Sequence, residues 1–360
     1  MLKALYLYLT WKCNLYCEHC WASAGSNGKE SELSMRRYKE IIIEAKTLGA
    51  SFLKISGGEP FLCEELTKQI ITFADALQFD IQVETNCTFM TQETADFLKM
   101  HHCQVATSLD GMKEHHDARR NCKGAFEQTV QGIKLLIDAG VKVNVVYSLS
   151  KRDDSELQSL IELLACLNVT EMKINPIMKV GRSKAVYKEQ GGKVFLLSAS
   201  ELLEIRNKFC TKPIHGVRVK MMLPVCMEGF SYIFDKSYIH LSCECHDVVG
   251  IMPSGDVCLC GIVKDMDVFV YGNVKDRSLN DILKNSDNYC ALEAIEEKLE
   301  GLCQECAVKS LCKGSCRAVA YSATGSIYAP NPLCLEMDLA GKFPLRKKRK
   351  VGGQSEVREN

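Results

Sequence analysis

The stretch "ALYLYLTWKCNLYCEHCWA", residues 4–22, joins an apolar run to Cys13, Cys17 and Cys20 at a Cys-x3-Cys-x2-Cys spacing. The run predicts a buried β-strand over 4–9. On a helix, the three thiols would line one face and could simply pack in a core. A structural zinc site is a second interpretation, although it needs a fourth ligand. The third is a [4Fe–4S] cluster held by three thiolates, which leaves one iron free to bind a ligand.

The sequence after this stretch alternates short apolar strands with amphipathic helices. Five more strands are predicted, at 51–56, 80–85, 104–109, 141–148 and 170–176. Helical patterns lie between them, as at 34–50 and 124–140, and end near glycine. Six such units in a row predict an α/β fold with a parallel sheet and right-handed crossovers.

Four polar or cysteine-containing segments follow successive predicted strands, and in parallel sheets the carboxyl ends of strands form the active site. They are the cysteine segment, "GGEP" (57–60), "NC" (86–87) and "DG" (110–111). In "GGEP", Gly57 and Gly58 allow the backbone to approach a ligand closely. Pro60 fixes the turn, and Glu59 offers a carboxylate suited to an ammonium group.

Composition bounds the class of protein. The 360 residues are 46% hydrophobic and 25% charged, with 45 basic and 45 acidic side chains, so no global field favours nucleic acid or a membrane. No apolar run approaches a transmembrane helix, and the N-terminus does not resemble a signal peptide. We therefore expect a cytoplasmic protein. Twenty cysteines in a reducing compartment favour metal ligation over disulfides.

The cysteine spacing, "GGEP", "SLDGMKEHHDARR" (108–120) and "GRS" (181–183) together resemble the radical S-adenosylmethionine (SAM) superfamily. The resemblance covers residues 4–182 and implies a partial (β/α)6 TIM-like barrel. It implies that the catalytic cysteines Cys13, Cys17 and Cys20 hold a [4Fe–4S] cluster whose open iron binds the amine and carboxylate of SAM. Reduction would then release a 5′-deoxyadenosyl radical that abstracts a substrate hydrogen.

The same resemblance assigns residues to SAM. Glu59, with the backbone of Gly57 and Gly58, would hold the methionyl amine. The remaining candidates are Ser108 and Arg120 for the carboxylate and ribose region, Asn86 as a weaker one near the ribose, and Tyr16 near adenine. Asp110 would order its loop, and a surface ion pair is the alternative for Asp110 and Arg120.

A second group of cysteines has the spacing Cys303-x2-Cys306-x5-Cys312-x3-Cys316-x17-Cys334. A tetrahedral zinc site would leave one of them over. With "GIMPSGDVCLC" (250–260), the spacing is similar to the SPASM domain, a small cysteine-rich α+β extension that binds auxiliary [4Fe–4S] clusters. The match covers 243–334.

This second resemblance implies two auxiliary clusters. Cys303, Cys306, Cys312 and Cys334 would bind one. Cys245, Cys260 and Cys316 would bind the other, with Cys243, Cys226 or no residue as the fourth ligand. An absent fourth ligand would leave an iron open to a substrate thiolate. Cys258 is a substitute candidate, and the others we interpret as packing or incidental residues: Cys63, Cys87, Cys103, Cys122, Cys166, Cys210 and Cys290.

Three regions are expected: a radical SAM barrel over 1–225, with core motifs at 4–182 and a bridging region at 183–225, a SPASM domain over 226–340, and a basic, flexible tail over 341–360. The first predicted strand begins close to Met1, so an N-terminal leader-binding domain is not expected. Leader recognition would then need a separate protein or the C-terminal domain. A reductant such as flavodoxin or ferredoxin is implied, and no nucleic acid or membrane partner.

The leading functional hypothesis is a maturase that crosslinks a ribosomally made precursor peptide, most directly through a cysteine thioether. Sulfatase-maturing relatives carry an aspartate after the cysteine that matches Cys260, thought to take the substrate proton, whereas this chain has Gly261. Formylglycine formation therefore ranks below, with cofactor-precursor processing, and carbon–carbon crosslinking is the nearer rival. An iron–sulfur electron carrier without radical chemistry is the alternative from a different class.

Overall fold

The computed structural model describes residues 2–150, 156–189, 196–228, 245 and 247–343. Within these ranges one ten-stranded sheet has the order β10-β9-β8-β1-β2-β3-β4-β5-β6-β7. The six predicted strands are confirmed as neighbours in a parallel arrangement. Their bounds are β1 (Ala4–Tyr8), β2 (Phe52–Ser56), β3 (Asp80–Thr85), β4 (Gln104–Ser108), β5 (Lys142–Leu149) and β6 (Glu171–Pro176).

The sheet extends beyond these six strands on both sides. A short parallel strand that the sequence did not indicate, β7 (Arg218–Met221), pairs with β6. On the other side β8 (Val248–Ile251) runs parallel to β1. Residues 250–260 form a hairpin, because β9 (Asp256–Cys258) pairs antiparallel with β8, and β10 (Val270–Asn273) pairs antiparallel with β9. The cysteine-rich C-terminal part thus continues the barrel sheet.

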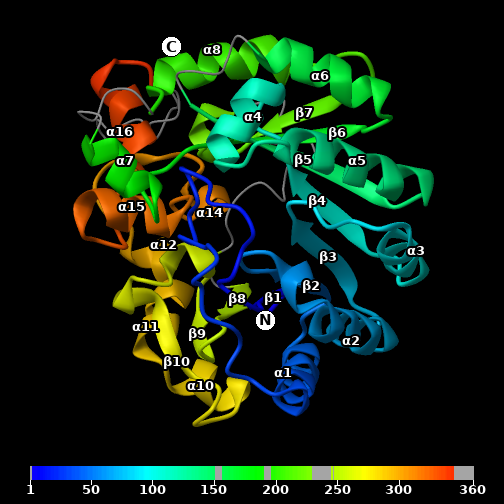
Figure 1. The fold of residues 1–360 in the computed structure, drawn as a ribbon. Coiled ribbons are helices and arrows are strands. Elements are labelled where there is room, and N and C mark those ends of the chain that lie inside the picture. The colour runs from blue at the N-terminus through cyan, green and yellow to red at the C-terminus, as the bar shows by residue number, and fades with distance from the viewer. Residues whose placement is uncertain (1, 151–155, 190–195, 229–244, 246, 344–360) are drawn as a thin grey trace, which may run out of the picture.

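Helices cover the outer face of the parallel strands, with α2, α3, α5 and α6 on one side of the molecule and the C-terminal elements on the other (Figure 1). The barrel helices are α1 (Met35–Thr47), α2 (Glu64–Ala76), α3 (Gln92–Met100), α4 (Lys113–Arg120), α5 (Ala125–Asp138), α6 (Leu157–Cys166), α7 (Ser183–Glu189) and α8 (Ala199–Phe209). Within the described ranges, no helix combines the length and apolarity that a membrane crossing requires.

Short helices make up most of the C-terminal part: α10 (Leu279–Asn285), α11 (Asp287–Glu293), α12 (Ile295–Lys298), α13 (Leu302–Glu305), α14 (Lys309–Cys312), α15 (Arg317–Thr324) and α16 (Pro332–Leu339). The described residues also include the 3₁₀ turns η1 (Pro60–Cys63), η3 (Val225–Met227), η5 (Gly261–Val263) and η6 (Asp267–Phe269). The expected boundary at 225/226 falls inside η3, and this boundary stays a proposal. Residues 344–360 of the expected tail lie outside the described ranges.

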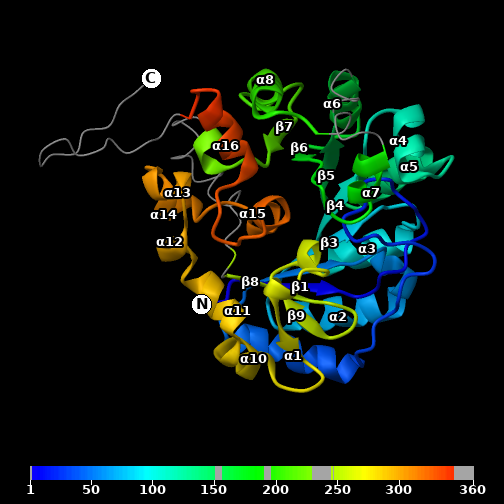
Figure 2. The ribbon, with the colours of Figure 1, turned by 90° about the vertical axis from the view of Figure 1, so that its left-hand side faces the viewer.

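Local signals explain where the helices begin. The Ser34 side chain accepts a hydrogen bond from the Arg37 backbone at the start of α1. Ser198 and Glu201 form a capping box at the start of α8. Glu336 of α16 accepts a further bond from the Ala199 backbone at 2.8 Å, so α16 packs beside α8 (Figures 1 and 2).

The two faces of the barrel strands differ in polarity. After the exposed Lys142, strand β5 alternates buried and half-buried residues. Its buried positions Val143, Val145 and Tyr147 belong to the main apolar core. Polar side chains on the other face include Lys54 and Glu84, which pair at 3.1 Å. This inner face of the barrel is therefore polar beneath the loops at the carboxyl ends of the strands.

Candidate metal and cofactor sites

The first site is the loop between β1 and α1. Residues 11–22 form turns and an isolated bridge but no helix, so the thiols of Cys13, Cys17 and Cys20 do not line a helix face. Cys13 and Cys17 are buried in a small apolar cluster, and Cys20 packs against it half-exposed. Burial raises the pKa of Cys13 to about 12, and the neighbouring Glu59, Cys17 and Cys20 add to the rise. The loop therefore gathers three thiols that gain from a cationic partner.

The "GGEP" loop lies directly against the cysteine loop. The backbone N–H groups of Gly58 and Glu59 donate to the carbonyls of Thr10 and Lys12 at 2.6 and 2.8 Å. A Cβ at Gly58 would stand 2.0 Å from the Lys12 oxygen, so only glycine allows this approach. The two loops therefore form one unit, as their placement at adjacent strand ends predicts.

Glu59 is buried, with both carboxylate oxygens engaged. One oxygen accepts from the Thr85 hydroxyl at 2.8 Å and from Phe61 N–H at 3.1 Å. The other accepts from Asn86 N–H at 2.8 Å. Burial nevertheless raises the pKa of Glu59 to about 7. Its carboxylate is fixed in direction and would gain from an ammonium group.

Asn86 extends this network to the cysteines. Its amide donates to Asn14 at 2.8 Å and lies 3.8 Å from the Cys13 sulfur. Ser108 is half-buried at the end of β4. The structure thus brings Asn86 to the cysteine loop and leaves Ser108 at the predicted strand end, and their roles toward SAM stay predictions.

Asp110 and Arg120 form a buried ion pair at 2.5 Å, so the surface alternative is not what the fold adopts. The Oδ2 atom of Asp110 also lies 3.2 Å from Nε2 of His19, and its Oδ1 atom accepts a hydrogen bond from the Ser148 N–H at 2.9 Å. Although burial opposes it, Arg120 and His19 hold the pKa of Asp110 well below its usual range. Arg120 reaches the Cys17 sulfur at 3.5 Å, which places a cation at the cysteine loop.

Arg182 of "GRS" holds the cysteine loop from the end of β6, a contact that the sequence did not assign. Its guanidinium donates to the carbonyls of Cys17 and Ala24, both at 2.7 Å. It also lies 3.7 Å from the ring centroid of Tyr16, which is 55% exposed. The pair presents a flat aromatic surface in the cysteine loop, and the role of Tyr16 near adenine stays a prediction.

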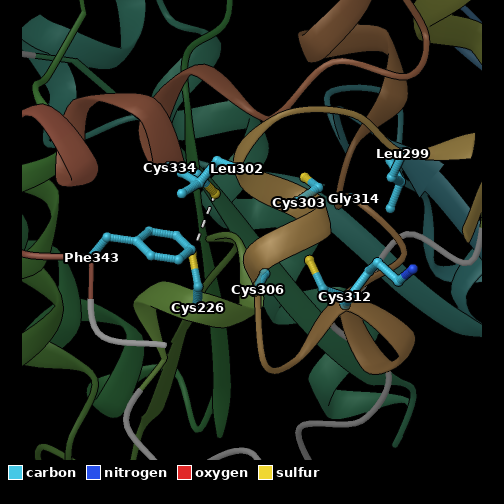
Figure 3. Close-up of a pocket in the computed structure, with 10 residues that line it drawn as sticks. Cys226, Leu299, Leu302, Cys303, Cys306, Cys312, Gly314, Cys334 and Phe343 are labelled. Atoms are coloured by element: carbon cyan, nitrogen blue, oxygen red, sulfur yellow. Dashed lines mark hydrogen bonds between the residues drawn. The ribbon is translucent and has the colours of Figure 1, made fainter. Parts of the chain in front are cut away.

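The second site is a cavity in the C-terminal part (Figure 3). Five cysteines line it, together with apolar residues such as Leu302 and Phe343: Cys226, Cys303, Cys306, Cys312 and Cys334. Four are the set that the SPASM resemblance implies. The fifth, Cys226, was expected, if anywhere, at the other auxiliary site. Its sulfur lies 3.3 Å from that of Cys334, and their hydrogen bond raises the pKa of Cys226 and lowers that of Cys334.

The third site joins Cys245, Cys260 and Cys316. Burial raises the pKa of Cys245 to about 11 and that of Cys260 to about 12, and the nearby Cys316 adds to both rises. Cys258 is buried in β9 within the main core. Burial raises the pKa of Cys258, and the nearby Asp256 and Cys260 raise it further. Cys243 lies outside the described residues.

Arg317 stands between these two sites and was not singled out from the sequence. It is fully buried, and its described hydrogen bonds go to the carbonyls of Ser315, Ile327 and Ala329. Its remaining terminal nitrogen has no partner among the described residues. Burial raises the pKa values of the surrounding thiols and Arg317 opposes that rise, at Cys245, Cys303, Cys312 and Cys316.

A buried guanidinium needs a counter-charge, and the groups placed to supply it are thiolates of two sites. Thiolate-bound clusters therefore fit this region. The Tyr271 hydroxyl is also buried without a described partner, near Cys245 and Cys260. Within the described ranges, no three His, Cys, Asp or Glu side chains stand as a preformed metal centre, so the ligand roles stay predictions.

An aromatic cluster links the first and third sites. Tyr8 stacks on Trp11 at 5.8 Å and meets Trp21 edge-on at 5.6 Å between ring centroids. A Cβ at Gly261, which follows Cys260, would stand 2.4 Å from the Trp21 ring. This position therefore has no room for any larger side chain.

The cysteines interpreted as packing residues are scattered. Cys87, Cys103 and Cys210 are buried, Cys63 and Cys122 are half-buried, and Cys166 and Cys290 are exposed. None of them lines the five-cysteine cavity. Cys122 packs against the cysteine loop's apolar cluster.

A barrel with a three-cysteine loop, joined to a cysteine-lined extension, defines an iron–sulfur protein of radical SAM architecture. Residues 7–164 match the model of the radical SAM superfamily, and residues 243–307 match that of the SPASM iron–sulfur cluster-binding domain. The chain belongs to the radical SAM superfamily and carries a SPASM domain. It is thus a member of an enzyme family that uses iron–sulfur clusters and SAM.

Its curated relatives include two kinds of enzyme. The AdoMet-dependent heme synthase of Methanosarcina barkeri is 28% identical over 340 residues, which cover 91% of this chain and 94% of the relative. The mycofactocin maturase MftC of Mycobacterium tuberculosis is 27% identical over 348 residues, which cover 91% and 81%. A solved structure of anSMEcpe with bound AdoMet and a peptide shares the fold, with a TM-score of 0.72, 17% identity and coverage of 94% and 95%.

Proposed function

We propose that this protein is a maturase that joins a cysteine sulfur to a carbon of another residue in a ribosomally made precursor peptide. The observation that carries the proposal is the three-thiol site of Cys245, Cys260 and Cys316. Cys226, one candidate for the fourth ligand, stands in the other auxiliary site. Cys243, the other candidate, lies outside the described residues, so among the described candidates three thiols remain. Three thiolates would leave one iron open to a substrate thiolate.

Similarity to peptide enzymes supports a peptide substrate. MftC is named a maturase, and anSMEcpe was solved with a peptide bound. The inner face of the barrel offers polar contacts through Lys54, Glu84 and Ser56, and Lys54 lies near Cys260. A reductant such as flavodoxin or ferredoxin, and a separate leader-recognition protein, are the further partners that we propose.

The bound SAM would supply a radical that removes a substrate hydrogen. This chain's own residues would position the SAM molecule. Glu59 directs a fixed carboxylate at the amine, Arg120 provides a buried cation, and Arg182 with Tyr16 presents a flat surface for adenine. The substrate thiol would bind on the opposite side, at the site of Cys245, Cys260 and Cys316.

Gly261 disfavours formylglycine formation. A carboxylate at this position would have to pass through the Trp21 and Tyr8 rings, 2.4 and 2.6 Å from a Cβ. The packing therefore excludes an aspartate base here as long as both rings keep their places. A general base for that reaction would have to come from elsewhere.

SAM affinity is expected to rise with pH between about 5 and 7. The pKa of Glu59 is raised from 4.5 to about 7, so the free folded protein holds a proton there that the unfolded chain loses. The stability from this proton is present below pH 4.5 and is lost as pH rises through 7. An iron-bound amine donates its N–H hydrogen bonds best to an ionised carboxylate, so calorimetric titration should show tighter binding and proton release in this window.

Glu59→Gln should abolish this pH dependence and weaken SAM binding about tenfold or more at pH 7.5, because a hydrogen bond to a charged group is lost. The matched control is Glu64→Gln, at the exposed first position of α2. An unchanged pH profile in Glu59→Gln would remove Glu59 from the SAM site.

The thioether is tested by anaerobic incubation of the enzyme with SAM, a reductant and a small cysteine-containing peptide encoded beside its gene. We expect the peptide to lose two hydrogens and one alkylatable thiol per event, seen by mass spectrometry before and after iodoacetamide. The same mass loss with every thiol still alkylatable would replace the thioether with a carbon–carbon bond or an oxidised residue.

Modification of a tetrapyrrole is the second candidate, favoured by the similarity to the AdoMet-dependent heme synthase over most of both chains. The same incubation with an iron porphyrin carrying propionate groups distinguishes the two. Porphyrin-dependent 5′-deoxyadenosine, with no peptide change, would favour this candidate over the maturase.

A further inference from the structure

The cavity of Figure 3 contains one thiol more than a cluster can use. A [4Fe–4S] cluster binds four protein thiolates, one on each iron. Cys303, Cys306, Cys312 and Cys334 already make four, and Cys226 is a fifth in the same lining. Cys226 arrives from η3, in the segment that connects the barrel to the C-terminal part, whereas the other four come from α13, α14, the turn before α14, and α16.

Cys226 and Cys334 occupy the same corner of the cavity. Their sulfurs face each other at 3.3 Å, and in the close-up Cys303 and Cys312 lie on the other side of the cavity. Thiolates on different irons of one cluster stand farther apart than this, because bridging sulfides separate the irons. The two thiols are therefore placed to serve a single iron.

Burial restricts what Cys226 and Cys334 can bind. It is 3% exposed and Cys334 is 7% exposed, so neither thiol can bind a ligand from bulk solvent without the cavity opening. The third site at Cys245, Cys260 and Cys316 is served by other segments, and none of its cysteines lines this cavity. Cys226 thus belongs to the site of Cys334 by position.

We propose that Cys226 and Cys334 are interchangeable ligands of one iron of the cluster in this cavity. When one sulfur binds the iron as thiolate, the other stays protonated beside it. Exchange breaks one iron–sulfur bond and forms the other, while one proton moves from the incoming sulfur to the departing one. No electron is transferred and no further reactant is needed.

Such a pair lets the cluster persist when one ligand is lost, whatever peptide or porphyrin the enzyme modifies. The inference depends on a cluster in this cavity and not on the proposed substrate. It is tested by iron and acid-labile sulfide content in full-length protein loaded anaerobically, together with the electron paramagnetic resonance signal after reduction.

Cys226→Ala and Cys334→Ala should each keep the iron content of the parent protein. The double variant and Cys306→Ala should each leave one iron without a protein thiolate and so lose about one iron or more per chain on desalting. Cys103→Ala, a buried barrel cysteine at 3% exposure, should lose none.

The signal adds a reading that does not depend on the double variant. In each single variant the reduced-cluster signal should keep its spin count and reduce to the form with the one remaining ligand, because the parent protein holds both forms. Iron loss from Cys334→Ala or Cys226→Ala equal to that from Cys306→Ala would overturn the proposal, even if the double variant fails to fold.

Discussion

Replacing Cys13, Cys17 and Cys20 together by alanine is expected to remove about four irons per chain and all cleavage of SAM, while the auxiliary sites keep their iron. The three thiols lie in one loop, and Arg120, Arg182 and the "GGEP" backbone hold that loop from three other strand ends. The auxiliary cysteines come from separate elements, all after residue 225. Iron analysis and assay of 5′-deoxyadenosine measure the two losses.

The matched control is Cys63→Ala together with Cys122→Ala, which removes two half-buried cysteines near the same loops. This variant should keep both iron and SAM cleavage. If the triple variant lost all iron at once with its fold intact, the auxiliary sites would depend on the first one, and the assignment of separate clusters would be wrong.

Arg317→Met should lower the iron content of both auxiliary sites and leave about four irons at the cysteine loop. The guanidinium is buried. Burial raises the pKa values of thiols in both sites, and the charge of Arg317 lowers them. Without it, ionising those thiols costs more, and removing one partner of buried opposite charges costs about 3–5 kcal/mol. Anaerobic loading followed by iron and sulfide analysis gives the result.

Arg317→Lys keeps the charge but not the paired hydrogen bonds to Ile327 and Ala329, so an intermediate iron content is expected. Arg206→Met deletes another buried guanidinium, which pairs with Glu228 at 2.8 Å. This control should lower stability without selective iron loss. Equal iron loss in both methionine variants would reduce Arg317 to a general packing role.

Much of the barrel could be predicted because local patterns and tertiary packing agree. The strand at 80–85 and the helix at 124–140 match β3 and α5 closely, since each carries its own apolar periodicity. The convergence of the cysteines, "GGEP" and Asn86 followed from one topological rule about parallel strands, and the hydrogen bonds of Glu59 and Asn86 confirm it.

What escaped the sequence depends on contacts between distant segments. Strand β7 has only four residues, too few for a periodic signal. The meeting of Cys226 with Cys334 joins η3 to α16 across the fold, and no spacing encodes it. Arg182 was part of a recognised motif, but its role in holding the cysteine loop became visible only through the carbonyls of Cys17 and Ala24. A single arginine such as Arg317 belongs to no sequence pattern. Its position directly after Cys316 is the one feature of the sequence that indicates a place near a cysteine site.

The most direct test of the account is the amount of 5′-deoxyadenosine formed from SAM by fully iron-loaded protein, under strong reductant and without oxygen, with and without the neighbouring peptide. We predict that the nucleoside forms, that the peptide increases its rate, and that each crosslink consumes one SAM. Absence of the nucleoside in protein with its full iron content would contradict the account and leave an iron–sulfur electron carrier on a radical SAM fold.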